Sequence, residues 1–538
     1  MGDTVVYNAK VYIDREHFTQ AVLVRDDRIA LVGTNDEILA KAEGAEKIDA
    51  QGRLLLPGFN DSHLHLHDFG RSTHHIQAYG VTSIDELVER GRELIDRRKL
   101  PKGSVVIGAG WNQEMFTGEK RHPNRYDMDR ISTEHAIIID RVCGHSVCCN
   151  SLAMKMAGIN RDTPQVEGGH IDLDEQGEPV GIFRENAIFG IKTIVPSYTA
   201  EQIREQLLYA MNYALEKGLT SVASRDIVEE NFQSIVDAYI KLFKEGVHLR
   251  VNMQCSIEED EVFNEFIKRG WVSRASMGHP YLTMGSFKLF ADGSLGSRTA
   301  YLRKPYHDDP STIGLRVHSP EAMDVFVQKA QKNNIQVIVH AIGDAAVDQV
   351  ISAFEKVTGK NKNDLRHAVV HCQITDLPLL QRMANNDILA IIQPIFLAHD
   401  LYMAEDRVGK ELVSTSYAWK TMEKLGIKTS YGTDCPVESI SPIECIDCAV
   451  NRNDLYNDYP EGGFYPAECV DVYTAVDAYT SGSAYATFDE KEKGRIKQGY
   501  LADLVLLDRD IFTIPRKEIR NTKVLWTMVG GNIAYRKK

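Results

Sequence analysis

Residues 54–65 read Leu54-Leu55-Leu56-Pro57-Gly58-Phe59-Asn60-Asp61-Ser62-His63-Leu64-His65, an apolar run that ends in two histidines. Side chains of a β-strand alternate between its two faces, so His63 and His65 share one face. Two imidazoles on one face at a strand end form half of a metal site. Because such a pair also arises by chance, the prediction depends on whether other strands supply further ligands.

Later apolar runs end in residues that can bind a metal. Residues 335–340 and 367–371 end in His340 and His371, and residues 427–434 end in the carboxylate of Asp434. An earlier run, residues 282–290, places Lys288 inside strand-like sequence. Each of these side chains is therefore predicted to lie at or near the carboxyl end of its own strand.

Helix-like segments separate these runs, for example residues 319–333 and 344–358. Strands that alternate with helices indicate a parallel α/β architecture, and polar side chains at strand carboxyl ends are typical of a (β/α)8 (TIM) barrel. Eight candidate barrel strands can be counted: the runs that contain His63, Lys288, His340, His371 and Asp434, and residues 220–223, 249–253 and 388–392.

The domain organisation follows from the spacing of these strands. The gap between about 66 and 215 is far longer than a usual βα connection of roughly 2–6 residues, so it predicts an inserted subdomain above the strand carboxyl ends. Both chain ends are rich in short strands, which predicts a small β-sandwich built from residues 1–56 and 482–538. The barrel domain is then expected over residues 57–481.

Composition limits the classes of partner. The net charge of −14 argues against nucleic acid, whose affinity comes from Lys and Arg neutralising phosphates. No apolar run is long enough to span a bilayer, so we expect no association with a membrane. Residues 1–6 lack the features of a signal peptide, so we expect a cytoplasmic location. The nine cysteines have no framework spacing, and we interpret them as reduced thiols, including the CxxC of residues 445–448.

The ordered motifs resemble the amidohydrolase superfamily of metal-dependent hydrolases, and within it the amidohydrolase 3 group that includes N-substituted formamide deformylase. The resemblance covers nearly the whole chain. Its elements are Pro57 to His65, Gly108-Ala109-Gly110-Trp111, Arg141 to His145, Lys288 to Ser294, His340 to Asp344, His371-Cys372-Gln373, Gly432 to Val437, and Gly494 to Val505.

The resemblance implies a metal site made of His63, His65, Lys288, His340, His371 and Asp434. His63 and His65 would bind one metal, and His340 and His371 a second. His67 would lie in the first turn after the strand, or among the residues that support the ligands from behind. Zinc suits these donors best, one or two ions per chain, with other divalent transition metals as alternatives.

The resemblance also implies that Lys288 is carboxylated. Burial and nearby cations lower the pKa of such a lysine, and its neutral amine can take up carbon dioxide to become an anionic bridging ligand. Asp434 would be the catalytic proton shuttle, and hydroxide generated by the metal would attack the carbon–nitrogen bond of a small, non-peptide amide. Trp111, Arg141 and His145 are candidates for substrate binding.

Other functions stay open at this point. A one-metal deaminase on the same barrel would need a glutamate three residues after His340, where this chain has Gly343. An isomerase, or a non-catalytic binding or regulatory relative, would use the same barrel. Release of amine and acid and the metal content would distinguish these functions. The sequence leaves the substrate and the oligomeric state open, a homodimer among the possibilities.

Overall fold

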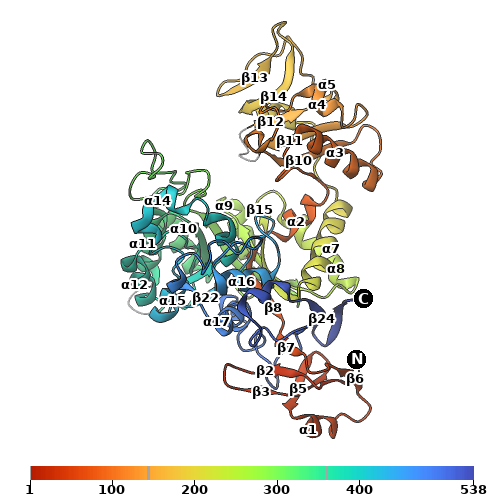
Figure 1. Ribbon diagram of the computed structural model, residues 1–538, viewed down its shortest axis with the longest axis vertical. Helices are drawn as coiled ribbons and strands as arrows, with labels where there is room; N and C mark the ends of the chain where they lie inside the picture. The colour runs from red at the N-terminus through yellow and green to blue at the C-terminus, as the bar shows by residue number, and fades with distance from the viewer. Residues whose placement is uncertain (1, 142–145, 359–361) are drawn as a thin grey trace. The chain divides into compact units, whose positions relative to one another are not determined.

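The computed structural model describes residues 2–141, 146–358 and 362–538 (Figure 1). They divide into two compact units, each described here by itself. The larger joins Met1–Leu66 to Leu208–Lys538, and the smaller is His67–Leu207.

The larger unit contains the barrel that the sequence predicts. Its eight parallel strands follow chain order: β8 (Phe59–Leu64), β15 (Leu219–Val228), β16 (Arg250–Ser256), β18 (Leu282–Phe290), β19 (Gln336–Ala341), β20 (Ala368–His371), β21 (Leu389–Ile392) and β22 (Thr429–Tyr431). Backbone hydrogen bonds bring the last strand back to the first: Asp434 N donates to His63 O and His65 N donates to Cys435 O, both at 2.8 Å. The prediction of a (β/α)8 barrel is confirmed.

The sequence of the barrel explains its layers. Strands such as Val337-Ile338-Val339 and Leu389-Ala390-Ile391-Ile392 are almost continuously apolar because helices cover one face and the barrel core the other. The helix α10 (Pro320–Lys332) begins with an N-cap, Ser319, whose side chain accepts a hydrogen bond from Ala322 N, and proline follows the cap. Helices α11 (Asp344–Thr358) and α12 (Leu377–Asn385) continue the outer layer (Figure 1).

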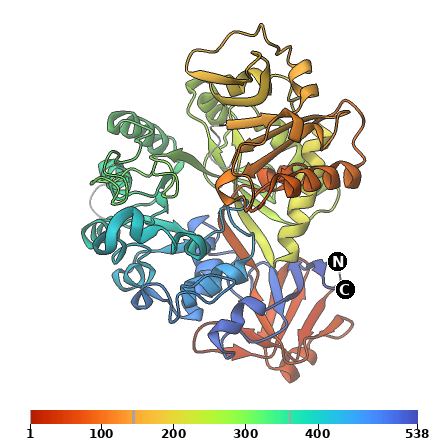
Figure 2. The same ribbon diagram turned by 45° about the horizontal axis from the view of Figure 1, so that its top comes forward.

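Both ends of the chain build two further sheets beside the barrel (Figure 2). One has four strands: β5 (Arg28–Gly33), β4 (Ala21–Arg25), β1 (Thr4–Tyr7) and β6 (Glu46–Asp49). The other has six: β25 (Asn532–Arg536), β24 (Val524–Val529), β23 (Leu504–Leu507), β7 (Leu54–Pro57), β2 (Lys10–Tyr12) and β3 (Phe18–Thr19). Residues of both sheets, among them Val6, Val22, Leu55, Leu504 and Trp526, form one core.

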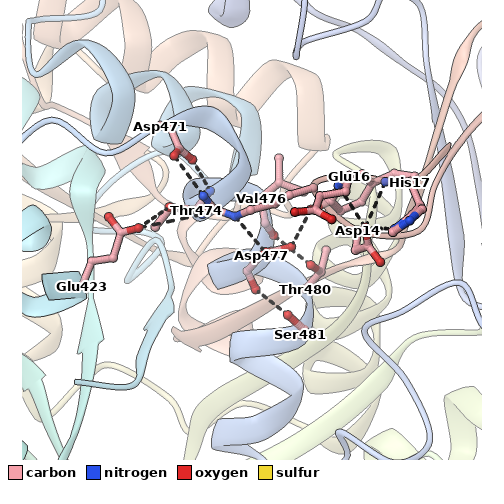
Figure 3. A network of polar contacts seen from close by, with 12 residues as sticks. Asp14, Glu16, His17, Glu423, Asp471, Thr474, Val476, Asp477, Thr480 and Ser481 are labelled. Atoms are coloured by element: carbon pink, nitrogen blue, oxygen red, sulfur yellow. Dashed lines mark hydrogen bonds and ion pairs between the residues drawn. The ribbon is translucent and has the colours of Figure 1, made fainter. Parts of the chain in front are cut away.

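A polar network joins the sheet of β2 and β3 to the helix α17 (Val472–Asp477) (Figure 3). Tyr12 donates from its hydroxyl to Asp477 Oδ1 at 2.9 Å. Three residues earlier on the same helix, Thr474 donates from its hydroxyl to Glu423 Oε1 at 3.1 Å. The N-terminal strands are thus tied to the segment that follows the last barrel strand.

The smaller unit is built on a six-stranded mixed sheet. Its order is β13 (Gly169–Leu173), β14 (Pro179–Glu185), β12 (Ser146–Cys149), β11 (Ala136–Arg141), β10 (Val105–Trp111) and β9 (Ile76–Gln77). The apolar runs at 105–108 and 136–139 therefore form neighbouring parallel strands. Among the described residues of either unit, no helix has the length and apolar character needed to cross a membrane.

Candidate metal centre

The carboxyl ends of four barrel strands place four histidines and one aspartate together. His63 and His65 come from the end of β8, His340 from β19, His371 from the end of β20, and Asp434 follows β22. Potential ligand atoms of His63, His371 and Asp434 all lie within 4.8 Å of one another, and all three residues are buried. The ring centroids of His340 and His371 are 4.4 Å apart.

Asp434 is the common partner of the first two histidines. Its Oδ1 lies 3.0 Å from His65 Nε2 and 3.3 Å from His63 Nε2. Within the described part of the chain, His63 Nε2 is a buried nitrogen without a hydrogen-bond partner. A buried polar atom left unpaired is costly, and a nitrogen lone pair facing a carboxylate oxygen is stabilised by a cation between them. The donor set therefore fits a divalent metal ion.

Polar groups behind the histidines fix which ring nitrogen faces the site. His63 Nδ1 lies 2.5 Å from Gln254 Oε1, and His371 Nδ1 lies 2.8 Å from Gln393 Oε1. Amide and carbonyl oxygens only accept hydrogen bonds, so Nδ1 of both rings is protonated and Nε2 is left with a lone pair. His340 is turned the other way, because its Nε2 donates to Gly293 O at 2.9 Å.

Replacement of Gln254 by leucine tests this orientation. Gln254 also donates from Nε2 to Ser62 O at 2.9 Å, so its amide is held in place and Gln254→Leu removes an oriented acceptor. We expect metal affinity, measured by competition with a chromophoric chelator, to fall about 10- to 100-fold. Gln349→Leu, on helix α11, is the matched control and should bind metal like the wild type. Equal affinities for Gln254→Leu and the wild type would contradict this role.

The protonation states of the site suit metal binding. Burial is the main reason why the pKa values of His63 and His371 lie well below the usual histidine value, and burial lowers the pKa of His340 to about 4. Burial alone would raise the pKa of Asp434, but the hydrogen bond from His65 and the electrostatic interactions with His63, His65 and His371 outweigh it and lower the pKa. The imidazoles of His63, His340 and His371 are therefore neutral and Asp434 is ionised, as metal ligands must be.

Lys288 is fully buried on β18 and has an unusually low pKa of about 7. Burial is the largest cause; Asp434 and Asp292 oppose it, and the nearby Arg225 reinforces it. The Lys288 Nζ stands 4.0 Å from the ring centroid of Phe290. A substantial fraction of this lysine is a neutral amine near neutral pH.

The backbone around the ligands is closely packed and locally unusual. His371 and Asp434 have φ values of 75° and 56°, in the left-handed region that non-glycine residues rarely adopt. At Gly432, a Cβ atom would lie 2.7 Å from His63 N, so only glycine fits beside the first strand. Asp61 accepts from His63 N at 3.0 Å and from Thr433 N at 3.0 Å, which joins β8 to the segment after β22.

The residues predicted to bind substrate belong to the smaller unit. Trp111 is fully buried and its indole N–H donates to Ile139 O at 3.0 Å. Arg141 donates to Gln113 Oε1 at 2.9 Å and lines a cavity of about 510 Å³. His145 lies outside the described residues. His67 is buried, with Nε2 3.0 Å from Gln206 Oε1.

Four polar residues around the candidate ligands are not predicted from the sequence: Gln254, Gln393, Asp61 and Asp292. Gln393 is the first polar residue after the apolar strand β21, the same pattern that identified the histidines. Gln254 belongs to an alternating polar series in β16 together with Asn252 and Ser256. Asp292 accepts backbone hydrogen bonds from Ile342 and Gly343 at 3.0 and 2.8 Å, contacts across strands that no local pattern predicts.

Comparison with known proteins gives a consistent result. Residues 46–535 match the model of the amidohydrolase family. The chain is 35% identical to the putative amidohydrolase YtcJ of Bacillus subtilis, over 96% of each chain. It is 29% identical to the N-substituted formamide deformylase of Arthrobacter pascens, over 99% of this chain and 98% of that one.

A solved structure of a metal-dependent hydrolase has the same fold as this chain. The crystal structure of an uncharacterized metal-dependent hydrolase from Pyrococcus furiosus superimposes with a TM-score of 0.77 at 28% identity. The match covers 95% of this chain and 100% of that one. With the barrel, the histidines at its strand ends and a family match along most of its length, this chain belongs to the amidohydrolase family.

Proposed function

We propose that the protein is a metal-dependent hydrolase that cleaves a non-peptide carbon–nitrogen bond, of the amide type, in a small molecule. The observation that supports this most directly is the buried group of His63, His371 and Asp434, whose ligand atoms lie within 4.8 Å of one another. Hydrolysis of such bonds needs an activated water and a group that protonates the departing nitrogen. We assign both tasks to residues at the barrel mouth.

His63 and His65 would hold one metal and His340 and His371 a second, with Asp434 as a further ligand. Zinc is the ion we propose, because neutral imidazole and carboxylate donors in a compact set suit it. When bound, a divalent metal supplies a Lewis acid that polarises a carbonyl and makes a water acidic near neutral pH.

Asp434 has the properties of a proton shuttle. Its carboxylate is buried, ionised and within 3.3 Å of two imidazole nitrogens. An ionised carboxylate can accept the proton that the attacking water loses and return it to the leaving nitrogen. Both transfers take place at the same oxygen atoms, so a single residue can complete the cycle.

Lys288 is proposed to become a carbamate. In this reaction, the lone pair of the neutral Nζ forms a bond to the carbon of carbon dioxide and the nitrogen loses a proton, which leaves an anionic oxygen donor. The low pKa of Lys288, about 7, makes the neutral amine available. Lys288 Nζ lies 4.0 Å from the Phe290 ring centroid, and the His340 ring lies 5.3 Å from the same ring, which supports a donor near the other proposed ligands.

Replacement of Lys288 by alanine tests this role. We expect Lys288→Ala to weaken binding of the second metal more than binding of the first, because the bridging anion is missing. The variant should also lose most of its activity. Formate or propionate at high concentration should restore part of the rate, whereas Lys288→Arg should not respond, since guanidinium stays protonated and fills the space. Full activity of Lys288→Ala without added acid would make the lysine merely structural.

The proposed reaction itself is tested with a substrate panel. Zinc-loaded protein is assayed for release of amine and acid from N-formyl and N-acyl amines, carbamates and lactams. Hydrolysis of at least one class, lost on chelation and restored by metal, is expected. Metal-replete protein that hydrolyses none of them would argue against the proposal and favour an isomerase or a binding protein.

A deaminase of the one-metal type fits the structure poorly. Its glutamate would occupy position 343, where a Cβ would lie 2.1 Å from Tyr301 O. Any side chain there would force the backbone of the neighbouring loop to move. Trp111, Arg141 and His145 remain candidates for substrate binding that rest on the sequence.

A further inference from the structure

Arg225 lies at an irregularity in the second barrel strand. The pairing of β15 with β16 shifts register between Ser224 and Ile227, which places Arg225 in a β-bulge. Bulges of this kind redirect a side chain and are frequent next to active sites. Arg225 is half-buried, and its Nε donates to Ser256 Oγ at 2.9 Å.

The guanidinium shares an aromatic neighbour with two of the candidate metal ligands. Its central carbon lies 5.6 Å from the ring centroid of Phe290. The same ring has Lys288 Nζ at 4.0 Å and the His340 ring at 5.3 Å. Arg225 therefore stands beside the metal centre, on the Phe290 side.

Arg225 forms no ion pair with any residue that the structure describes. The adjacent carboxylate, Asp226, is engaged elsewhere: its Oδ2 accepts from Ser224 Oγ at 2.8 Å and from Tyr239 at 2.6 Å. This lack of a counter-ion is notable in a chain of net charge −14. Other partly buried arginines of the same unit are paired, as Arg366 is with Glu490 and Arg382 with Asp348 and Glu355.

A structural role would leave a different pattern of contacts. Arg452, which is fully buried, donates to Phe464 O at 2.6 Å and to Tyr417 O at 2.8 Å, so carbonyls hold it in place. Arg225 has a single hydroxyl partner at Nε, and its two terminal nitrogens have no hydrogen bond among the described residues. These nitrogens form the planar fork that matches a carboxylate in two parallel hydrogen bonds.

We propose that Arg225 is a specificity-determining residue that binds a carboxylate of the substrate, so that the substrate is an amide carrying a carboxylate, of the class of N-acylated amino acids. This inference rests on the proposed hydrolase function and names its substrate class. Two aromatic rings suit the apolar part of such a molecule: the half-buried Phe290, and Phe396, which stacks on His371 with ring centroids 5.6 Å apart.

The test compares two compounds that differ only in the carboxylate, N-formylphenylalanine and N-formylphenethylamine. Binding of both to zinc-loaded Asp434→Asn protein is measured by calorimetry, with and without Arg225→Met, and kcat/KM is measured in proteins that retain Asp434. We expect the wild-type arginine to favour the carboxylate compound by about 10- to 100-fold, the range for a charge-assisted pair. Arg225→Met should abolish that preference and leave the neutral compound within a few-fold.

Two control variants separate recognition from architecture. Ser256→Ala removes the hydrogen bond to Nε but keeps the guanidinium, and should retain most of the preference. Arg536→Met makes the same charge change on the exposed end of β25 and should behave like the wild type. Metal content is measured in every variant, because Arg225 also neighbours Lys288.

The outcomes are distinct. Three results would overturn the proposal. The preference for the carboxylate compound could survive Arg225→Met, the wild type could show no preference, or neither compound could bind. The proposal would also be overturned if Arg225→Met lost metal and lost affinity for both compounds equally. Arg225 would then act by shaping the surroundings of Lys288. If binding depends on Arg225 but the wild type hydrolyses neither compound, carboxylate recognition stands and the hydrolase proposal fails for this class.

Discussion

Replacement of Asp434 by asparagine is expected to lower turnover by at least about 100-fold, the low end of what a positioned acid–base group contributes. Asparagine keeps the size of the side chain and one oxygen, so the neighbouring histidines should still bind metal. It cannot, however, take up a proton at neutral pH. Elemental analysis of the purified variant and a steady-state assay on the best substrate of the panel are the measurements.

The same chemical change elsewhere provides the control. Asp471 caps helix α17, its side chain accepting from Thr474 N, and asparagine caps helices equally well. Asp471→Asn should therefore keep both metal and activity. A metal-replete Asp434→Asn protein with the wild-type rate would place the proton shuttle on another residue.

Loss of the two histidines of the first strand is expected to remove most of the metal. His63 and His65 supply two of the four imidazoles, and both have Nε2 within 3.3 Å of Asp434 Oδ1. The His63→Ala, His65→Ala double variant should fall from one or two bound ions per chain, the number we expect in the wild type, to a small fraction of that value. Activity should fall with the metal content.

A buried histidine from the same barrel distinguishes ligand loss from general damage. His367 lies just before β20, with Nδ1 accepting from Val337 N at 2.9 Å and Nε2 2.8 Å from Gln331 Oε1. His367→Ala should lose thermal stability yet keep its metal per folded chain. Stoichiometric metal in the folded double variant would refute the assignment of His63 and His65.

Much of the fold could be predicted from the sequence because its signals are local. Apolar runs separated by amphipathic segments indicate a barrel, and the alternation of a strand places His63 and His65 on one face. Other apolar runs finish in a polar residue, which predicts that His340, His371 and Asp434 lie at the ends of their strands. In a parallel barrel all strand carboxyl ends meet at one face, so the order of the chain was sufficient to predict that these residues gather.

Other features depend on contacts between segments far apart in the chain. The orientation of the His63 ring depends on Gln254, which is 191 residues away, and that of His371 on Gln393. The unpaired state of Arg225 depends on where every nearby carboxylate points, and the low pKa of Lys288 on complete burial. Hydrogen bonds and desolvation act over a few ångströms in space, irrespective of separation along the chain. Only the folded structure therefore decides which ring nitrogen faces the candidate metal centre and which cation has no carboxylate partner.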